Sequence, residues 1–186
     1  MKKFVLFFWI AVAAVPVGSW NAVRAAGAGV VQRGPERRHS RYEKDDWSVW
    51  YRGRKVEGAV ASSFTDLGGG YGKDNWTVFY AGRKMEGAAA SSFAALGSGY
   101  GKDTWSVWYR GRKVEGVSAS SFATLGGGYG KDSWTVVFEG CTVKDAAASS
   151  FESLGRGYAR DAWKVYYRGE VIPGASPGSF RVPRRR

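Results

Sequence analysis

The chain has 186 residues, of which 44% are hydrophobic and 16% aromatic, and it carries a formal net charge of +12. This length allows one domain with a sizeable core, and the aromatic content excludes a disordered chain in spite of 27 glycines. The single cysteine excludes an internal disulfide, so the folded state must depend on packing.

The first residues are typical of a secretory signal peptide. Two lysines precede an apolar stretch over residues 4–17, and Val23-Arg24-Ala25 offers the small or apolar residues that a signal peptidase requires. We therefore expect residues 1–25 to be removed and the protein to be periplasmic, on the cell surface or secreted. An uncleaved membrane anchor is the alternative, but the apolar run is shorter than the ~20 residues of a spanning helix. No transmembrane segment is expected after cleavage.

The positive charge lies mainly in two flanking segments. Residues 26–44, expected to form a flexible basic linker, hold five basic and two acidic side chains, and the basic tail at 181–186 holds four arginines. Residues 45–180 carry a net charge of only +2, from sixteen basic and fourteen acidic side chains. Basic tails suit an anionic surface or serve only as solubilising segments. A folded nucleic-acid reader would show a basic face on the fold itself, so a nucleic-acid partner is disfavoured.

Self-similarity is the strongest signal in the chain. The unit reads Asp-x-Trp-[Ser/Thr]-Val-aromatic-Tyr-x-Gly-Arg-Lys-Val-Glu-Gly, followed by Ala-Ser-Ser-Phe-x-x-Leu-Gly-x-Gly-Tyr-Gly-Lys. Four copies are complete and a fifth ends at Phe180, which makes residues 45–180 one repeat domain. Its period of 29 residues is marked by Trp47, Trp76, Trp105, Trp134 and Trp163.

Each copy is predicted to contain a β-hairpin. The alternation in Trp47, Val49 and Tyr51 predicts a strand whose uniform face belongs to the core. Arg52-Gly53 then suits a two-residue turn with positive φ. Since this face is nearly constant among the copies, we expect successive copies to share one hydrophobic seam lined by the recurring indoles.

The second half of each copy is less regular. Residues 63–67 suit either one helical turn or an irregular strand, and Gly68-Gly69-Gly70 predicts a turn. One copy buries too few large side chains to offset the entropy of ordering 29 residues, so neighbouring copies must stack. The fold class is therefore all-β, with tandem hairpin repeats arranged as a solenoid, a meander or a propeller-like array.

The units resemble the DKNYY repeats of exported bacterial proteins over roughly residues 42–180. The resemblance depends on Asp-x-x-x-Val-x-Tyr-x-Gly-x-x-[Val/Ile], as in residues 161–172, and on Gly-Ala-x-x-x-Ser-Phe, as in residues 174–180. The Lys-Asn pair that follows the aspartate in this family is absent, and a tryptophan stands one place further on. The resemblance implies export and β architecture, and it implies no particular chemistry.

The second face of the predicted strand is the candidate ligand-binding surface. Its aromatic side chains vary among the copies, and arginines stand beside them, as would suit stacking on sugars or flat ligands. The candidate residues are Trp50, Phe79, Trp108, Tyr166, Arg52 and Arg110. The alternative, which we favour, is a second layer of the core.

The other polar motifs predict structural roles. An aspartate recurs once per copy, as in Asp45 and Asp74, and its carboxylate is expected to cap the turn before the strand or to pair with a cation. Residues 69–77 also fit a calcium-binding nonapeptide, but a glycine turn is the favoured interpretation. His39 is the only histidine, so we expect no catalytic, cofactor or metal site. Cys141 could cross-link two molecules if it is exposed.

These features favour an exported, non-enzymatic repeat module, acting as a structural or interaction protein of the bacterial cell envelope. Its partner would be an envelope protein or a glycan, with the basic tails adding attraction to anionic surfaces. The alternative is a hydrolase that acts on envelope polymers through two repeat carboxylates at about 5–9.5 Å.

Overall fold

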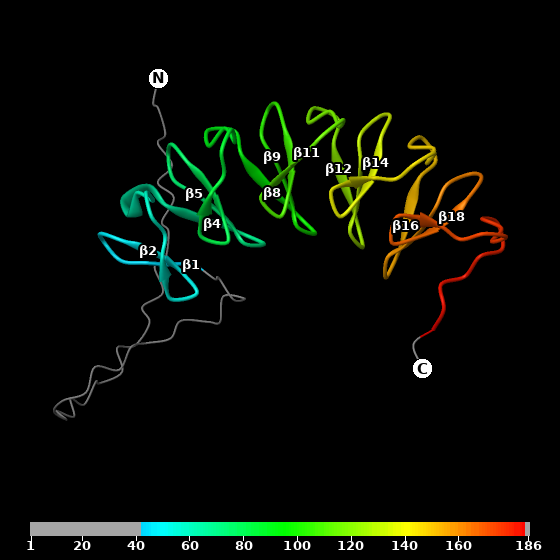
Figure 1. Cartoon of the computed structure of the whole chain (residues 1–186), viewed down its shortest axis with the longest axis horizontal. Helices are drawn as coiled ribbons and strands as arrows, with labels where there is room; N and C mark the ends of the chain where they lie inside the picture. The colour runs from blue at the N-terminus through cyan, green and yellow to red at the C-terminus, as the bar shows by residue number, and fades with distance from the viewer. Residues whose placement is uncertain (1–41, 185–186) are drawn as a thin grey trace, which may run out of the picture. The chain divides into compact units, whose positions relative to one another are not determined.

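The computed structural model describes residues 42–184 (Figure 1). The predicted signal peptide and most of the predicted linker lie outside these residues. Apart from one 3-10 turn, η1 (Ala61–Ser63), all regular structure in the described part is β-strand. No helix in this part is long and apolar enough to cross a membrane. The predicted all-β class is therefore confirmed.

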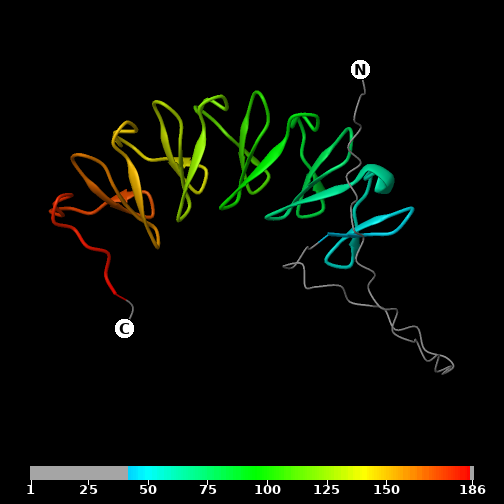
Figure 2. The same ribbon diagram turned by 180° about the vertical axis from the view of Figure 1, so that it is seen from behind.

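Five small antiparallel sheets follow one another in chain order, as Figure 1 and the view from behind in Figure 2 show. The first has three strands: β1 (Tyr42–Lys44), β2 (Val49–Tyr51) and β3 (Arg54–Lys55). The second has β4 (Thr65–Gly68), β5 (Tyr71–Lys73), β6 (Val78–Tyr80) and β7 (Arg83–Lys84). The third has β8 (Ala94–Gly97), β9 (Tyr100–Lys102), β10 (Val107–Tyr109) and β11 (Arg112–Val114). The fourth has β12 (Ala123–Gly126), β13 (Tyr129–Lys131), β14 (Val136–Phe138) and β15 (Cys141–Thr142). The last has β16 (Glu152–Gly155), β17 (Tyr158–Arg160), β18 (Val165–Tyr167) and β19 (Glu170–Val171).

In each sheet, strands that follow one another in the chain pair side by side, which is a meander. The predicted meander therefore describes the strand order within one sheet. The predicted hairpins are confirmed: φ is +50° at Arg52 and +75° at Gly53, the pair of positive values that a type I′ turn needs. The uncertain segment before the glycines forms a short strand, with a bulge between Asp66 and Gly68. Each sheet therefore joins the end of one sequence copy to the start of the next.

The repeat domain begins earlier than predicted. The segment Tyr42–Lys44, assigned from sequence to the flexible linker, forms β1 and pairs with β2 through the register Tyr42↔Tyr51. Its composition is basic and polar, but its place matches that of β5 in the second sheet. The boundary expected between residues 44 and 45 therefore lies at or before Tyr42.

The recurring aspartate caps the turn that leads into the hairpin. In the second sheet, Asp74 Oδ1 accepts hydrogen bonds from the backbone N–H groups of Trp76 at 2.8 Å and Thr77 at 2.7 Å. Its Oδ2 accepts from the backbone N–H of Val60 in the preceding loop at 2.9 Å. The predicted capping role is confirmed, and the carboxylates of Asp74, Asp103, Asp132 and Asp161 also tie a strand to the loop before it.

The predicted seam of indoles is wrong. The side chains at the five tryptophan positions are between 78% and 88% exposed. Each indole lies in the aspartate turn, and the strand begins only two residues later, at Val49 in the first sheet. The alternation along the strand therefore does not reach back to the tryptophan. The core consists instead of the recurring tyrosine, valine and phenylalanine, as in Tyr71, Val78 and Phe93.

Both faces of the hairpin strands β6, β10, β14 and β18 are buried. Val78 packs into the core of its own repeat, whereas Phe79, one residue on, packs into the preceding core with Tyr42 and Phe64. Trp108, Val137 and Tyr166 fill the same position at the later junctions. The variable face is thus a second core layer between successive sheets, which confirms the favoured alternative. Contacts among β4, β8, β12 and β16 also join neighbouring sheets.

Candidate functional site

The predicted aromatic ladder is not a surface. Phe79, Trp108 and Tyr166 are buried, because each fills a junction between two sheets. Trp50 is half-buried, since no described sheet precedes its own. A ligand therefore has no access to this set as a continuous platform. The burial of Phe79, Trp108 and Tyr166 argues against these side chains as ligand contacts, and the ligand-binding role of Trp50 stays a prediction.

The two predicted arginines do lie at the surface. Arg52 and Arg110 are exposed at the tips of their hairpins, and each guanidinium lies over the ring of the preceding tyrosine, at 5.8 Å for Tyr51 and 5.3 Å for Tyr109. Such cation–π contacts hold the guanidinium near the strand end while leaving its N–H groups free to meet a ligand.

The exposed indoles form the first candidate surface. Their backbone N–H groups are fixed by the aspartate carboxylates, as at Trp76 and Trp105, where the distance is 2.8 Å in both cases. The same turn recurs in every repeat, so equivalent side chains recur at a regular interval along the array. Sequence reasoning missed this row because it placed the tryptophan inside the strand. The preceding Asp-x pair, typical of a turn, was the signal that could have corrected it.

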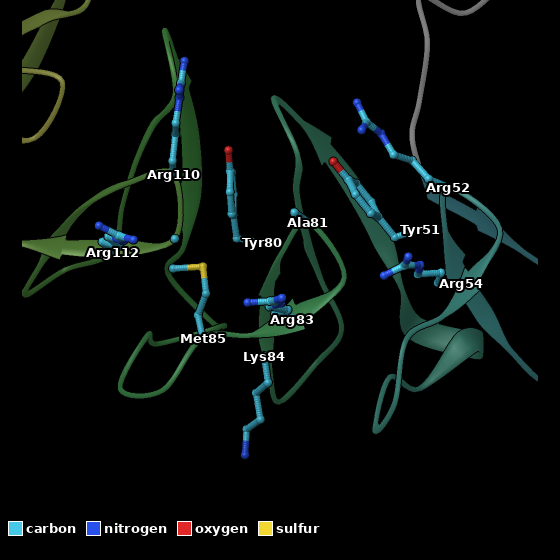
Figure 3. Close-up of a pocket in the computed structure, with 11 residues that line it drawn as sticks. Tyr51, Arg52, Arg54, Tyr80, Ala81, Arg83, Lys84, Met85, Arg110 and Arg112 are labelled. Atoms are coloured by element: carbon cyan, nitrogen blue, oxygen red, sulfur yellow. The ribbon is translucent and has the colours of Figure 1, made fainter.

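A groove on the hairpin side forms the second candidate surface (Figure 3). It has a volume of about 740 Å³ and is contributed by three successive hairpins. Its lining includes six cationic side chains and two tyrosine rings. None of the described residues that line it is acidic. The cationic residues are Arg52, Arg54, Arg83, Lys84, Arg110 and Arg112.

A smaller groove of about 460 Å³ follows at the next hairpin. It shares Arg110 and Arg112 with the first groove, and it is also lined by Lys113, Glu139 and Cys141. Cys141 is exposed, which meets the condition set for a cross-link between molecules. The cross-link itself stays a prediction.

The recurring carboxylates serve the fold. Asp74, Asp103, Asp132 and Asp161 are buried. Burial by itself would raise the pKa of Asp103, but the backbone N–H groups of Ala89, Trp105 and Ser106 outweigh it, and the pKa is lowered below its ordinary value. The same balance lowers the pKa of Asp132 and of Asp161, where the hydroxyl of Tyr166 also donates.

The lysine in the segment that fits a calcium-binding nonapeptide, residues 69–77, has a structural role. Lys73 Nζ donates to the carbonyl oxygens of Ala90 at 2.8 Å and Phe93 at 3.1 Å in the loop that follows β7. Asp74 is occupied by backbone N–H groups, as described above. Among residues 42–184, no group of three or more His, Cys, Asp or Glu side chains is placed to hold a metal ion.

Comparison with known proteins identifies one family. The DKNYY family matches residues 42–185, which covers the whole array of sheets. No curated protein and no solved structure matches the chain.

Proposed function

The chain belongs to the DKNYY family, and we propose that it is an exported, non-enzymatic repeat module that binds a glycan of the bacterial cell envelope along its row of exposed indoles. The observation that carries this proposal is the exposure of all five recurring tryptophans, at 78–88% of each side chain.

The fold does not require these indoles. Their side chains stand outside every core cluster of the described residues, and only their backbone N–H groups take part in the aspartate turn. The tryptophan is nevertheless present in all five copies, including the fourth, which has drifted at Cys141 and Asp145. A large apolar side chain that is repeated without a packing role is typical of a contact surface.

A polymer suits this surface better than a single compact partner. One indole per repeat offers the same flat ring and N–H donor at regular intervals, and a glycan chain repeats its own apolar C–H faces in the same way. The ring face is electron-rich and attracts such C–H groups. Each contact is weak, but contacts along one chain act together, because the first bound unit raises the effective concentration of the next.

The carboxylates support a role without catalysis. A glycosidase of the alternative kind needs one carboxyl group whose pKa is raised so that it can act as an acid. In this chain, the pKa values of Asp103, Asp132 and Asp161 are lowered, and their oxygens accept hydrogen bonds from backbone N–H groups.

Export and surface attraction complete the proposal. The segment 1–25 directs export and is removed, which cell fractionation and N-terminal sequencing of the mature protein test. The arginines at 181–186 add attraction to anionic envelope polymers, so deleting them weakens envelope association at low salt. Full retention of association by that variant would remove the tail from the proposal.

The direct test replaces all five exposed tryptophans by alanine and measures co-sedimentation with purified, insoluble envelope polysaccharide. We expect binding to be lost and to fall stepwise as more indoles are replaced, while the unfolding midpoint stays unchanged. The matched control replaces exposed neighbours on the same turns, Asp46, Asn75, Thr104 and Ser133, by alanine and should bind as the parent does. A fivefold tryptophan variant that binds normally would refute the proposal.

A further inference from the structure

We propose that the basic groove of Figure 3 is a second binding site, separate from the indole row, which holds the oxyanion groups of an acidic polysaccharide. The two surfaces lie at opposite ends of each hairpin strand. In the first sheet, Trp47 precedes β2 and Arg52 follows it.

Three of the arginines occupy the same position in three successive repeats. Arg54, Arg83 and Arg112 come from β3, β7 and β11, and Figure 3 shows them in a row beneath Tyr51 and Tyr80. None of these three arginines makes an ion pair within the described residues. Guanidinium groups present a planar fork of donors that matches carboxylate, sulfate or phosphate oxygens.

The charge of the groove is local. The net charge of residues 45–180 is close to neutral, but the buried aspartates lie in the turns before the hairpin strands, at the end of each strand away from these arginines. Among the lining residues, only Lys84 has an acidic partner, Glu86, at 3.5 Å and outside the groove. The five arginines that line about 740 Å³ with no acidic residue among them repel one another, and an anionic ligand relieves that repulsion.

The site extends beyond one hairpin. Ala81 stands where the neighbouring tips carry Arg52 and Arg110, so the centre of the groove stays open between two flanking arginines. The following groove reuses Arg110 and Arg112 and adds Lys113. The third hairpin therefore supplies guanidiniums to both grooves, whereas the fourth hairpin contributes Glu139 and Cys141, so the basic site lies along the first three hairpins.

The tyrosine rings argue against nucleobases. One face of Tyr51 meets the ring of Tyr42 at 4.8 Å, and Gly82 packs so closely that a Cβ there would lie 3.0 Å from the Tyr51 Cβ. Tyr80 lies between Tyr71, at 4.9 Å, and Gly111 in the same way. Single-stranded nucleic acids bind by stacking bases on free ring faces, which these two rings do not offer.

The interval between guanidiniums also favours a polysaccharide. Packed sheets lie roughly 10 Å apart, whereas a nucleic-acid strand carries a phosphate for about each 3.4 Å of helix axis. The groove therefore suits a chain whose charges are widely spaced, such as a polysaccharide with one acidic sugar in each disaccharide.

The test compares binding of the purified protein to carboxymethyl-dextran and to neutral dextran of the same length. We expect binding of the charged polymer to be at least about tenfold tighter and to weaken with salt. The variant Arg54→Glu/Arg83→Glu/Arg112→Glu should lose at least about tenfold in that affinity. The control Lys55→Glu/Lys144→Glu/Arg156→Glu makes the same change in net charge outside the groove, at exposed residues, and should keep the affinity of the parent. Thermal unfolding checks that both variants fold.

Three outcomes would overturn the proposal: equal binding of both dextrans, an unaffected groove variant, or equal losses in the groove and control variants. Tighter binding of single-stranded oligothymidine than of carboxymethyl-dextran would assign the groove to nucleic acid and would also overturn it. The fivefold tryptophan variant should keep its affinity for carboxymethyl-dextran. This result distinguishes a failure of the groove proposal from a failure of the proposed glycan binding by the indole row.

Discussion

The hydroxyl of Tyr129 donates a hydrogen bond of 3.0 Å to the carbonyl oxygen of Gly157, 28 residues further along the chain. The same hydroxyl accepts from the backbone N–H of Gly169, also at 3.0 Å, in the hairpin turn of the next repeat. Tyr42, Tyr71 and Tyr100 make the equivalent pair of bonds in their repeats. In each case, one tyrosine hydroxyl therefore links its own sheet to both the glycine turn and the hairpin turn of the next sheet.

Replacing Tyr129 by phenylalanine should lower the free energy of unfolding by about 1–3 kcal/mol, because the N–H of Gly169 loses its partner. Chemical denaturation measures the change. Tyr158→Phe is the matched control, since Tyr158 occupies the same position in the last repeat and its hydroxyl has no hydrogen-bond partner within residues 42–184. Equal losses in both variants would contradict the bridging role of the hydroxyl.

Replacing Lys102 by methionine should destabilise the array by about 1.5–3 kcal/mol. Its ammonium donates to the carbonyl oxygens of Ala119 at 2.9 Å and Phe122 at 3.3 Å, and methionine leaves both acceptors without this donor. Urea unfolding of this variant is compared with that of Lys113→Met, whose lysine is exposed and pairs only with Glu115. An exposed pair contributes little, so the control should unfold close to the parent.

The protein should lose stability in acid. The pKa values of Asp103, Asp132 and Asp161 are lowered in the folded state, so the unfolded chain binds more protons at low pH. Their contribution is complete above the unfolded-state pKa, near about 3.9, and is lost as pH falls through the folded-state value. Denaturation at a series of pH values measures this loss. The variant Asp132→Asn should have a lower free energy of unfolding than the parent at neutral pH, and that free energy should fall less steeply as the pH decreases. An unchanged dependence on pH would contradict the contribution assigned to Asp132.

A single copy cut from the array, such as residues 71–99, should not unfold cooperatively. Tyr71 reaches forward 28 residues to Gly99 and 40 residues to Gly111, so the excised copy keeps at most one of these bonds. It also loses Trp108, which completes the core around Tyr71 from the next sheet. Circular dichroism during heating tests this, and a sigmoidal transition in the single copy would show that the junctions are dispensable.

Much of the local structure was predictable from the residues. The glycine at the second place of Arg52-Gly53 and its equivalents indicates a tight hairpin turn, because glycine adopts positive φ without strain. The aspartate before each strand was correctly predicted to cap a turn, since its carboxylate reaches N–H groups two and three residues ahead. These features depend on neighbours within a few residues, and the sequence contains all of them.

The faces of the strand were harder to predict. Alternation from Trp47 through Val49 to Tyr51 suggested one buried side, but it does not show where the strand begins. The aspartate turn withdraws the tryptophan from the strand and leaves its indole in solvent. Phe79 and Trp108 looked like a variable surface, but each fills a junction whose shape depends on the residues of another repeat.

The sequence alone therefore determined the 29-residue period, the hairpins, the family and the dependence of each copy on its neighbours, since these follow from short-range residue patterns and their repetition. Only the tertiary structure decided that tyrosine, valine and phenylalanine fill the core, that the indoles face solvent, and that arginines of three hairpins meet in one groove. The filling of the junctions and the clustering of the arginines depend on contacts between different repeats, and no local pattern specifies which side of a strand its neighbour will cover.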